Sequence, residues 1–411
     1  MRINIQVAKA AGCVCAPPSK SMAHRLLICA AMSEGESVIH GISQCEDVSA
    51  TLDCLRSLGV SCAREGEDTV RVRGRDLRAA SPESPLCCRE SGSTLRFFIP
   101  IALLSGNNVM LRGSEYLMQR PMSVYRMLCK EKGLTYLQDG QSVVVRGPLK
   151  AGEYSVVGNI SSQFISGLLF VLPVVTGDST IHIAPPVESR SYINLTMEAL
   201  REFGVEVLWK NEHTLFVRGG QKYRAHETTV EGDYSNAAFL DALRLFGGEV
   251  GVQGLRPDSI QGDSVYRRYF DMLCKGAPTI HIGDCPDLGP ILFSVAAAKH
   301  GGIFNGTRRL RMKESDRAAA MAEELKKFGT AVTVYEDTVV IYPADFHAPS
   351  EALSGHNDHR IVMSLVVLLT LTGGTIDGAE AVSKSFPEFF DYLRMLGIPV
   401  NEDRAEGRTA T

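Results

Sequence analysis

Six short polar clusters recur along the chain, and each opens an apolar stretch that ends at small residues. Successive clusters are 72, 70, 72, 54 and 70 residues apart. They begin at Ser19, Ser91, Ser161, Asp233, Asp287 and Asn357. A strand-like segment and then an amphipathic segment closing on glycine follow each cluster. A repeat of this length predicts repeated structural modules, so it limits the possible folds more than any single motif does.

The clusters have the composition of helix starts. Ser, Asp and Asn accept hydrogen bonds from the unpaired amides of a first helical turn, and Ser161-Ser162-Gln163 and Asn357-Asp358 precede long apolar runs. A helix start also attracts phosphate and carboxylate groups. One such cluster would indicate plain capping, but six that carry Lys, Arg and His favour anion binding.

The pattern between clusters predicts the fold class. In the first repeat, residues 20–33 resemble a helix, 37–41 a strand, 47–59 a helix and 60–74 a hairpin. The other repeats follow the same order. We therefore expect an α/β protein of repeated βαβαββ-type units, with helices packed behind mixed sheets.

The short step of 54 residues from Asp233 to Asp287 indicates a missing hairpin. Residues 1–18, which include RINIQVA, would compensate if they crossed over to supply a strand. Three repeats in residues 19–229 would then form one domain, and residues 1–18 with 230–411 the other. Two crossings, near residues 18 and 230, would form a hinge that closes the domains on a ligand.

Composition excludes several classes of protein. The net charge of −4 and the lack of a dense Lys/Arg stripe argue against nucleic-acid binding. No apolar run is long enough to cross a membrane, and MRINIQVAK lacks a signal-peptide core, so we expect a cytoplasmic protein, and we expect a monomer.

Cysteine and glycine patterns give no support for a cofactor. The eleven cysteines are an odd number, and neither Cys13-x-Cys15 nor Cys87-Cys88 has zinc-site spacing. Phosphate-binding loops of the Walker type and a dinucleotide fingerprint are absent from the sequence. We therefore expect no metal, no ATP or NAD, and reduced, partly buried cysteines.

In the first half of the chain, basic residues stand at the helix starts. Lys20 and Ser21 lie at the first one, with Arg25 one turn further, so all three can address one anion. Gly92 would let a ligand approach the backbone closely, and Arg96 adds a charged fork. Arg120-Pro121 is expected to begin another helix, since proline favours the first helical position.

The second half repeats this arrangement. Lys313-Glu314-Ser315-Asp316-Arg317 precedes an alanine-rich helix, Asn357-Asp358-His359-Arg360 heads an apolar one, and Lys384 precedes the last. Charge runs of this kind usually form exposed helix pairs, and an isolated His359 would usually be structural. Because three such clusters stand at helix starts in this half of the chain, we favour an anion-binding site over isolated surface pairs.

Together these residues predict a cleft between two domains that binds ligands with several negative charges. Asp287 and Glu314 are the carboxylates suited to proton transfer there, and the surrounding cations should keep them ionised. The basic side chains expected around the cleft are Lys20, Arg25, Arg96, Arg120, Lys313, Arg317, Arg360 and Lys384.

At these residues the chain resembles the enolpyruvyl transferases, specifically the branch that acts on shikimate 3-phosphate, over essentially its whole length. The matching motifs are Pro18-Ser19-Lys20-Ser21 with Arg25, Gly92 with Arg96, Arg120-Pro121, Ser161-Ser162-Gln163, Glu231-Gly232-Asp233, Lys313-Glu314 with Arg317, and Asn357-Asp358-His359-Arg360. The resemblance implies two domains of three units each. It also implies transfer of the enolpyruvyl group of phosphoenolpyruvate to the 5-hydroxyl of shikimate 3-phosphate, on the route to chorismate and aromatic amino acids, without cofactor or metal.

The resemblance further implies roles for particular residues. Shikimate 3-phosphate would contact Lys20, Ser21, Arg25, Ser161, Ser162, Gln163, Ser189, Tyr192, Asp287 and Lys313. Phosphoenolpyruvate would contact Lys20, Gly92, Arg96, Arg120, Gln163, Arg317, Arg360 and Lys384. Proton transfer would fall to Asp287, at the hydroxyl, and to Glu314 and Lys20, at the methylene and phosphate.

The chain departs from the family pattern at three positions. Glu90 stands where Asn is common, Ser93 where Thr is common, and Arg309 where an amide is common. These departures bear on substrate affinity and on sensitivity to phosphonate mimics of phosphoenolpyruvate.

Two alternative functions remain open from the residues. One is enolpyruvyl transfer to UDP-N-acetylglucosamine, which shares the fold and chemistry but fits the Ser-Lys-Ser and Asn-Asp-His-Arg sets less well. The other is a non-catalytic anion-binding relative, against which Asp287, Glu314 and Lys384 speak.

Overall fold

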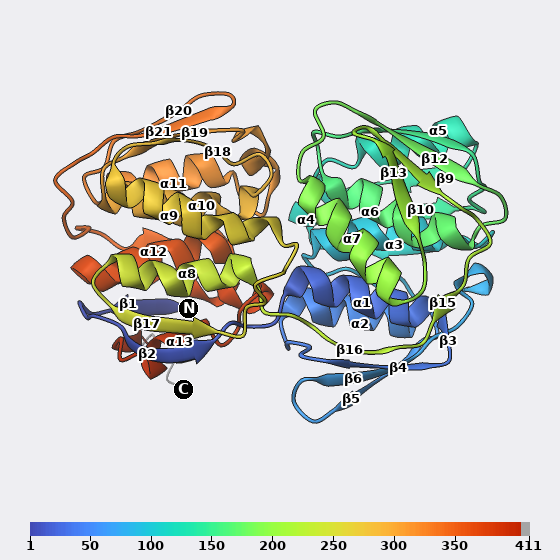
Figure 1. Ribbon diagram of the computed structural model, residues 1–411, viewed down its shortest axis with the longest axis horizontal. Helices are drawn as coiled ribbons and strands as arrows, with labels where there is room; N and C mark the ends of the chain where they lie inside the picture. The colour runs from blue at the N-terminus through green and yellow to red at the C-terminus, as the bar shows by residue number, and fades with distance from the viewer. Residues whose placement is uncertain (404–411) are drawn as a thin grey trace, which may run out of the picture. The chain divides into compact units, whose positions relative to one another are not determined.

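The computed structural model describes residues 1–403, which divide into two compact units. The first unit comprises Pro18–Glu231 with Asp258–Gly262. The second comprises Met1–Pro17, Gly232–Pro257 and the chain from Asp263 onward. In both, strands lie at the outside and helices pack together inside (Figure 1).

The first unit has three four-stranded sheets of one topology, ordered β16-β4-β6-β5, β7-β8-β10-β9 and β11-β12-β14-β13. In each sheet the first pair of strands is parallel and the other two pairs are antiparallel. A short parallel pair joins β3 and β15. The strands are β3 (Ser33–Glu34), β4 (Glu36–His40), β5 (Ser61–Glu65), β6 (Thr69–Arg73), β7 (Leu86–Cys87), β8 (Val109–Arg112), β9 (Thr135–Gln138), β10 (Ser142–Arg146), β11 (Glu153–Val157), β12 (Ser179–Ala184), β13 (Val207–Asn211), β14 (Thr214–Val217), β15 (Tyr223–Arg224) and β16 (Glu227–Thr229).

Three helices of the first unit, α1, α3 and α6, are buried along almost their whole length and form the centre of its core. The helix α3 packs against α6, and α1 packs against α2 and α7. The helices are α1 (Lys20–Met32), α2 (Glu46–Ser57), α3 (Gly92–Ala102), α4 (Glu115–Gln119), α5 (Ser123–Lys132), α6 (Ser162–Val171) and α7 (Arg190–Glu202), with 3₁₀ turns at Leu77–Ala79 and Leu172–Val174.

The second unit repeats this plan around the buried helices α8, α10 and α12. Its sheets are β18-β19-β21-β20, β22-β23-β1-β24 and the parallel pair β17-β2. The strands are β1 (Arg2–Ile5), β2 (Ala11–Cys15), β17 (Glu249–Gln253), β18 (Thr279–His281), β19 (Gly302–Asn305), β20 (Val332–Val334), β21 (Thr338–Ile341), β22 (Leu353–Ser354), β23 (Gly374–Asp377) and β24 (Val400–Asp403). The helices are α8 (Tyr234–Leu245), α9 (Tyr266–Lys275), α10 (Gly289–Ala298), α11 (Arg317–Lys326), α12 (His359–Thr372) and α13 (Phe389–Met395), with 3₁₀ turns at Gly262–Val265, Pro286–Leu288, Arg308–Met312 and Ala379–Lys384.

The predicted fold class is confirmed. The second repeat, for example, runs β7, α3, β8, α4 with α5, then β9 and β10, which is the expected βαβαββ order. Because each module turns one apolar helix inward and covers it with a sheet, the strictly apolar runs after the polar clusters are those that become fully buried.

Residues 1–18 do supply a strand to the short fourth repeat, as expected, but RINIQVA is not that strand. Arg2–Ile5 pairs antiparallel with β23 and β24, so it completes the sheet of the last repeat. The strand that joins the short fourth repeat is Ala11–Cys15, which pairs parallel with β17. Within the described chain no hairpin lies between β17 and β18, so the fourth repeat keeps a sheet of two strands.

Five of the six polar clusters cap a buried helix, as their composition predicts. The side chains of Ser19, Ser91, Ser161, Asp233 and Asp358 each accept a hydrogen bond from a backbone amide of the first turn. The sixth differs: Asp287 lies in the 3₁₀ turn before α10, which begins without a side-chain cap. Its carboxylate is therefore available for other contacts.

The expectation that Arg120-Pro121 begins a helix was wrong. Arg120 follows the last residue of α4, and α5 begins two residues after Pro121, at Ser123. A proline has no N–H to continue the ladder of the preceding helix, so here Pro121 follows the end of α4 instead of opening α5.

None of the helices in residues 1–403 has both the length and the apolar composition needed to cross a membrane.

Substituting the cap of α8 tests the capping account. Asp233 Oδ1 accepts from the amide of Asn236 at 2.8 Å, so Asp233→Ala should lower the free energy of unfolding by about 1 kcal/mol. Urea denaturation measures it as a lower midpoint at constant slope. Asp233→Ser, which keeps a capping oxygen, should stay close to wild type; equal losses in both variants would contradict the capping role.

Candidate active site

In the first unit, the start of α1 carries a buried ion pair. Lys20 is the first residue of α1, and its Nζ lies 2.8 Å from Asp47 Oδ2 on α2. Both side chains are about nine-tenths buried. The carboxylate offsets a lysine that a helix N-terminus would otherwise disfavour, which explains how a cation is held there.

Arg25 is one turn further along α1 and is buried. Its guanidinium donates to Thr196 Oγ1 at 2.8 Å and to the carbonyls of Ser21 and Tyr192 at 2.5 and 3.1 Å. Burial lowers the pKa of Arg25 to about 10, against the opposing influence of Tyr192, so the side chain stays charged at neutral pH. Arg25 thus connects α1 to α7.

A second group lies at the start of α3. A Cβ built on Gly92 would come within 2.4 Å of Arg120 Nη1 and 3.4 Å of Arg96 Nη1, so both guanidinium groups lie against this glycine. Arg96 Nη1 donates to Gln163 Oε1 at 2.7 Å, and Gln163 Nε2 donates to Ser93 Oγ at 2.8 Å. The glycine therefore makes room for two arginines at the helix start.

Ser189 and Tyr192 lie at the start of α7. Ser189 is buried, precedes the helix and has a left-handed backbone with φ of 55°. Ser161 caps α6 and Ser162 is its first residue. Most of the first-half residues that the sequence singled out lie at helix starts of the first unit. Arg25, Arg96 and Tyr192 lie further along, within the first two turns of their helices, and Arg120 follows α4.

Sequence reasoning missed a buried polar network that joins these helix starts. His24 Nδ1 lies 2.8 Å from Thr51 Oγ1, which lies 2.9 Å from Thr94 Oγ1, and Thr94 donates onward to Ser91 Oγ. Burial, with the charges of Lys20 and Arg25, holds the pKa of His24 well below its usual range, so the imidazole is neutral. The polar positions within α1, α2 and α3 were its only signal in the sequence.

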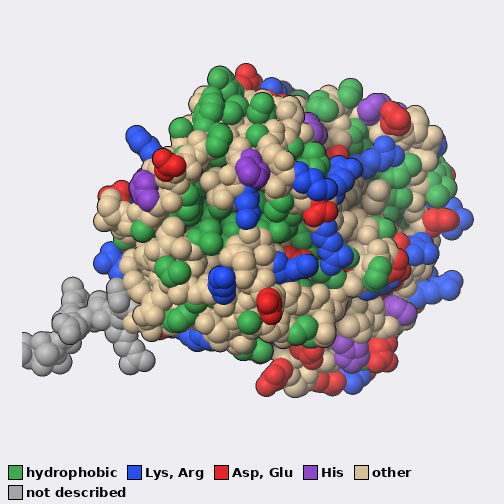
Figure 2. Space-filling view, turned by 60° about the vertical axis from the view of Figure 1, so that its left-hand side comes forward, with side chains coloured by type: hydrophobic (Ala, Val, Ile, Leu, Met, Phe, Trp, Pro, Cys, Tyr) green, Lys and Arg blue, Asp and Glu red, His purple; other side chains and the backbone are tan. Residues whose placement is uncertain are grey.

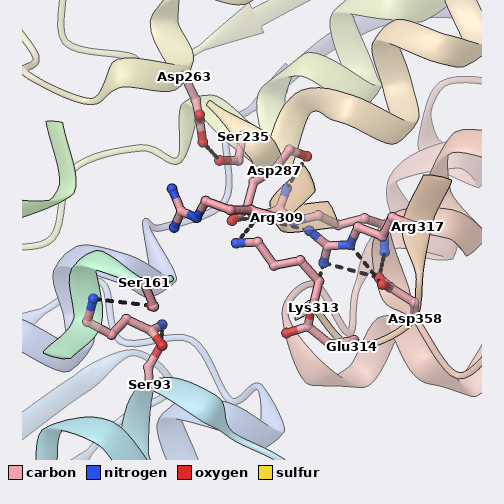
Figure 3. Close-up of polar contacts among 12 residues, drawn as sticks. Ser93, Ser161, Ser235, Asp263, Asp287, Arg309, Lys313, Glu314, Arg317 and Asp358 are labelled. Atoms are coloured by element: carbon pink, nitrogen blue, oxygen red, sulfur yellow. Dashed lines mark hydrogen bonds and ion pairs between the residues drawn. The ribbon is translucent and has the colours of Figure 1, made fainter. Parts of the chain in front are cut away.

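In the second unit the central residue is Arg317, the first residue of α11, whose side chain is 1% exposed. It contacts three carboxylates: Asp287 Oδ1 at 2.9 Å, Glu314 Oε2 at 2.6 Å and Asp358 Oδ2 at 2.8 Å (Figure 3). Burial alone would lower the pKa of Arg317, but these carboxylates outweigh it and raise the pKa above its usual range.

Asp287 is the meeting point of three cations. Lys313 Nζ lies 3.0 Å from its Oδ1, and Arg360 Nη2 lies 3.0 Å from its Oδ2, in addition to Arg317. Burial would raise the pKa of Asp287, but Arg360, Lys313 and Arg317 hold it well below the usual range. The carboxylate is therefore ionised at any pH near neutrality, as the sequence predicted.

The pKa of Lys313 is also lowered, but for a lysine this shift favours the neutral form. Burial lowers its pKa to about 8, and the charges of Arg317 and Arg309 act in the same direction, while Asp287 opposes them. Arg309 is buried nearby and donates to the carbonyl of Gly283 at 3.4 Å. Lys313 therefore changes its charge state close to physiological pH.

Lys384 ends a 3₁₀ turn and does not itself begin a helix. Its Nζ donates to the carbonyl and to the side-chain Oδ1 of Asn357, at 2.6 and 2.8 Å. The second-half residues singled out from the sequence, Asp287, Lys313, Glu314, Arg317, Arg360 and Lys384, thus all lie in the second unit.

One group of the described residues has the donors for a metal ion, namely Glu323, Glu324 and His356. Glu324 already has a cation, since Lys327 Nζ lies 3.1 Å from its Oε2. These side chains therefore form a charge-compensated cluster. The face in Figure 2 carries both basic and acidic side chains.

The fold and these helix starts define an enolpyruvyl transferase architecture. EPSP synthase from Acinetobacter baumannii matches with a TM-score of 0.78 at 24% identity, covering 98% of this chain and 100% of that one. The enolpyruvyl transferase NikO from Streptomyces tendae matches with a TM-score of 0.77 at 15% identity, covering 97% and 98%.

The chain belongs to the EPSP synthase (3-phosphoshikimate 1-carboxyvinyltransferase) family, whose model matches residues 6–393. A relative from Clostridium acetobutylicum is 40% identical over 411 residues, which cover 94% of this chain and 95% of the relative. One from Clostridium perfringens strain 13 is 38% identical over 426 residues, covering 98% and 100%. Both are named 3-phosphoshikimate 1-carboxyvinyltransferase.

The Arg317 network predicts a stability cost on the loss of one buried charge. Asp358→Asn should lower the free energy of unfolding by about 3 kcal/mol, because a buried cation loses part of its compensation. In the matched control Asp391→Asn, which breaks the exposed Arg394–Asp391 pair, the loss should be below about 1 kcal/mol. Urea denaturation measures both; similar small losses would show that the network contributes little.

Proposed function

We propose that this protein transfers the enolpyruvyl group of phosphoenolpyruvate to the 5-hydroxyl of shikimate 3-phosphate and releases phosphate. The product leads toward chorismate and the aromatic amino acids. The observation that carries the proposal is Asp287, a partly buried carboxylate that Lys313, Arg317 and Arg360 keep ionised, in a chain of the EPSP synthase family. Such a carboxylate among cations suits a reaction that moves a hydroxyl proton between polyanionic substrates.

The proposal divides binding between the units. Shikimate 3-phosphate would be held mainly by Lys20, Ser21, Arg25, Ser161, Ser162, Ser189 and Tyr192. Phosphoenolpyruvate would be held by Arg96, Arg120 and Gly92 together with Arg317, Arg360 and Lys384, and Gln163 would contact both substrates. Because one reaction needs both sets, the substrates would have to contact both units during turnover.

Two steps account for the chemistry. In the addition, the 5-hydroxyl oxygen bonds to C2 of phosphoenolpyruvate, the hydroxyl loses its proton and the methylene C3 gains one. In the elimination, C3 loses that proton and the bond from C2 to the phosphate oxygen breaks. Asp287 would accept the hydroxyl proton. Glu314 and Lys20 would transfer protons at the methylene carbon and at the phosphate.

The low pKa of Asp287 makes it ionised but only weakly basic. Lys313, 3.0 Å away with a pKa of about 8, is mostly protonated near neutral pH. As an ammonium it would hold Asp287 in place and bind shikimate 3-phosphate, while Asp287 would remain the acceptor of the hydroxyl proton.

Phosphate release from phosphoenolpyruvate tests the function directly. Shikimate 3-phosphate as acceptor should support release, and UDP-N-acetylglucosamine should not. Release with the UDP-sugar alone would assign the chain to the sister activity, and release with neither acceptor would favour a non-catalytic anion-binding protein.

The pKa of Lys313 predicts a pH dependence. A lysine with a pKa of about 8 is charged below that pH, so kcat/KM should fall as the pH rises through about 8 and the ammonium is lost. Steady-state assays from pH 6 to 10 measure this limb. In Lys313→Arg, which stays charged, the limb should move to higher pH; an unmoved limb would exclude Lys313 as its source.

A further inference from the structure

Two buried charged side chains of helix α11, Arg317 and Glu324, contact the two ends of the turn formed by residues 354–358. Arg317 binds Asp358 at one end of the turn, with Nε 2.8 Å from Oδ2. Glu324, seven residues later and therefore on the same face of the helix, reaches the other end. Its Oε2 accepts from the amide of Ser354 at 3.0 Å, and its Oε1 lies 3.0 Å from His356 Nε2.

The turn between these contacts has an unusual backbone. His356 and Asn357, at φ of 47° and 52°, both adopt the left-handed conformation, although neither is glycine. Two successive residues of this kind persist only where neighbouring groups hold them. The amide of His356 donates to Ser354 Oγ at 3.2 Å. Glu324 on α11 binds the amide of Ser354 and the imidazole of His356.

The turn presents groups to two cations of the proposed site. The carbonyl and side-chain oxygens of Asn357 accept from Lys384 Nζ, and the carboxylate of Asp358 binds Arg317. Asp358 also caps α12 through the amide of Arg360. The conformation of Asn357 and Asp358 therefore helps to orient Lys384 and, together with Asp287 and Glu314, Arg317.

Burial and charge favour an ionised Glu324–His356 pair. Glu324 has no exposed surface, and the side chain of His356 is 22% exposed. The hydrogen bond to Glu324 raises the pKa of His356 in spite of burial, with Glu323 adding to this and Lys327 opposing it. Burial would raise the pKa of Glu324, but His356, Ser354 and Lys327 lower it overall.

We propose that Glu324 and His356 form a positioning pair that fixes the Asn357–Asp358 turn and thereby orients Lys384 and Arg317 for phosphoenolpyruvate. The orientation part of this proposal rests on the proposed function. Neither side chain touches substrate in this account; both act through the turn.

Hydrogen exchange tests the pair without reference to activity. In Glu324→Gln, amides in residues 351–362 should exchange at least about tenfold faster than in wild type, since a hydrogen bond to a charged group is weakened. The matched control is Glu323→Gln, which removes the neighbouring charge on the same helix without either bond, and its exchange should be unchanged. Equal protection in Glu324→Gln and wild type would overturn the proposal.

Kinetics test the consequence for the site. Glu324→Gln and His356→Ala should raise the KM for phosphoenolpyruvate roughly tenfold, with a change of less than about twofold in the KM for shikimate 3-phosphate. His356→Gln, whose amide can still donate to Glu324, should recover most of the loss. Equal increases in both KM values, or no recovery, would show a merely structural role.

The two proposals fail in different ways. Wild-type protein without phosphate release would refute the proposed function, and hydrogen exchange would still report on the turn. If Glu324→Gln does not fold, His356→Ala and His356→Gln supply the same comparison from the other side of the pair.

Discussion

The site of the second unit depends on the ion pairs between the buried guanidinium of Arg317 and three carboxylates. Taking this charge out of water is costly, and the cost is offset only by close carboxylates with good geometry. Asp287, Glu314 and Asp358 supply three, all within 3.0 Å. The contact to Asp358 anchors the start of α12, and the contact to Asp287 holds a carboxylate in the 3₁₀ turn before α10.

The charges of this network are balanced among its own residues. Three carboxylates are balanced by Arg317, Lys313 and Arg360, so the contacts that hold the residues in place leave no net charge among these six. Two further basic residues, Arg309 and Lys384, donate to the carbonyls of Gly283 and Asn357. Under the proposed function, cations of the site would exchange part of these contacts for a phosphorylated carboxylic acid, which binds arginine and lysine through charge-assisted hydrogen bonds.

The first unit also holds basic side chains at helix starts, but with different partners. Lys20 is held by Asp47, while Arg96 and Arg120 share the space that Gly92 leaves at the start of α3. Repetition places a helix start at each of these points, and the side chains that differ between repeats give each its chemistry. Asp287 shows this most clearly, because it replaces a cap with a carboxylate that binds three cations.

Features carried by local sequence could be predicted. The repeat spacing predicted the modules, and the polar clusters predicted the caps at Ser19, Ser91, Ser161 and Asp233, because capping depends on residues within one turn. Pairings between distant residues could not be predicted, since neither Asp47 nor Glu324 has a local pattern that indicates its partner. The same limit explains the error for RINIQVA: an apolar alternation predicts a strand but not the sheet that receives it.

Single-turnover kinetics of Asp287→Asn would test the central claim most directly. The substitution keeps the size of the side chain and removes the charge that Lys313, Arg317 and Arg360 hold in place. With enzyme in excess over shikimate 3-phosphate and phosphoenolpyruvate, the addition step should slow by at least about 100-fold, the usual contribution of a general base. Addition within a few-fold of the wild-type rate would contradict the account.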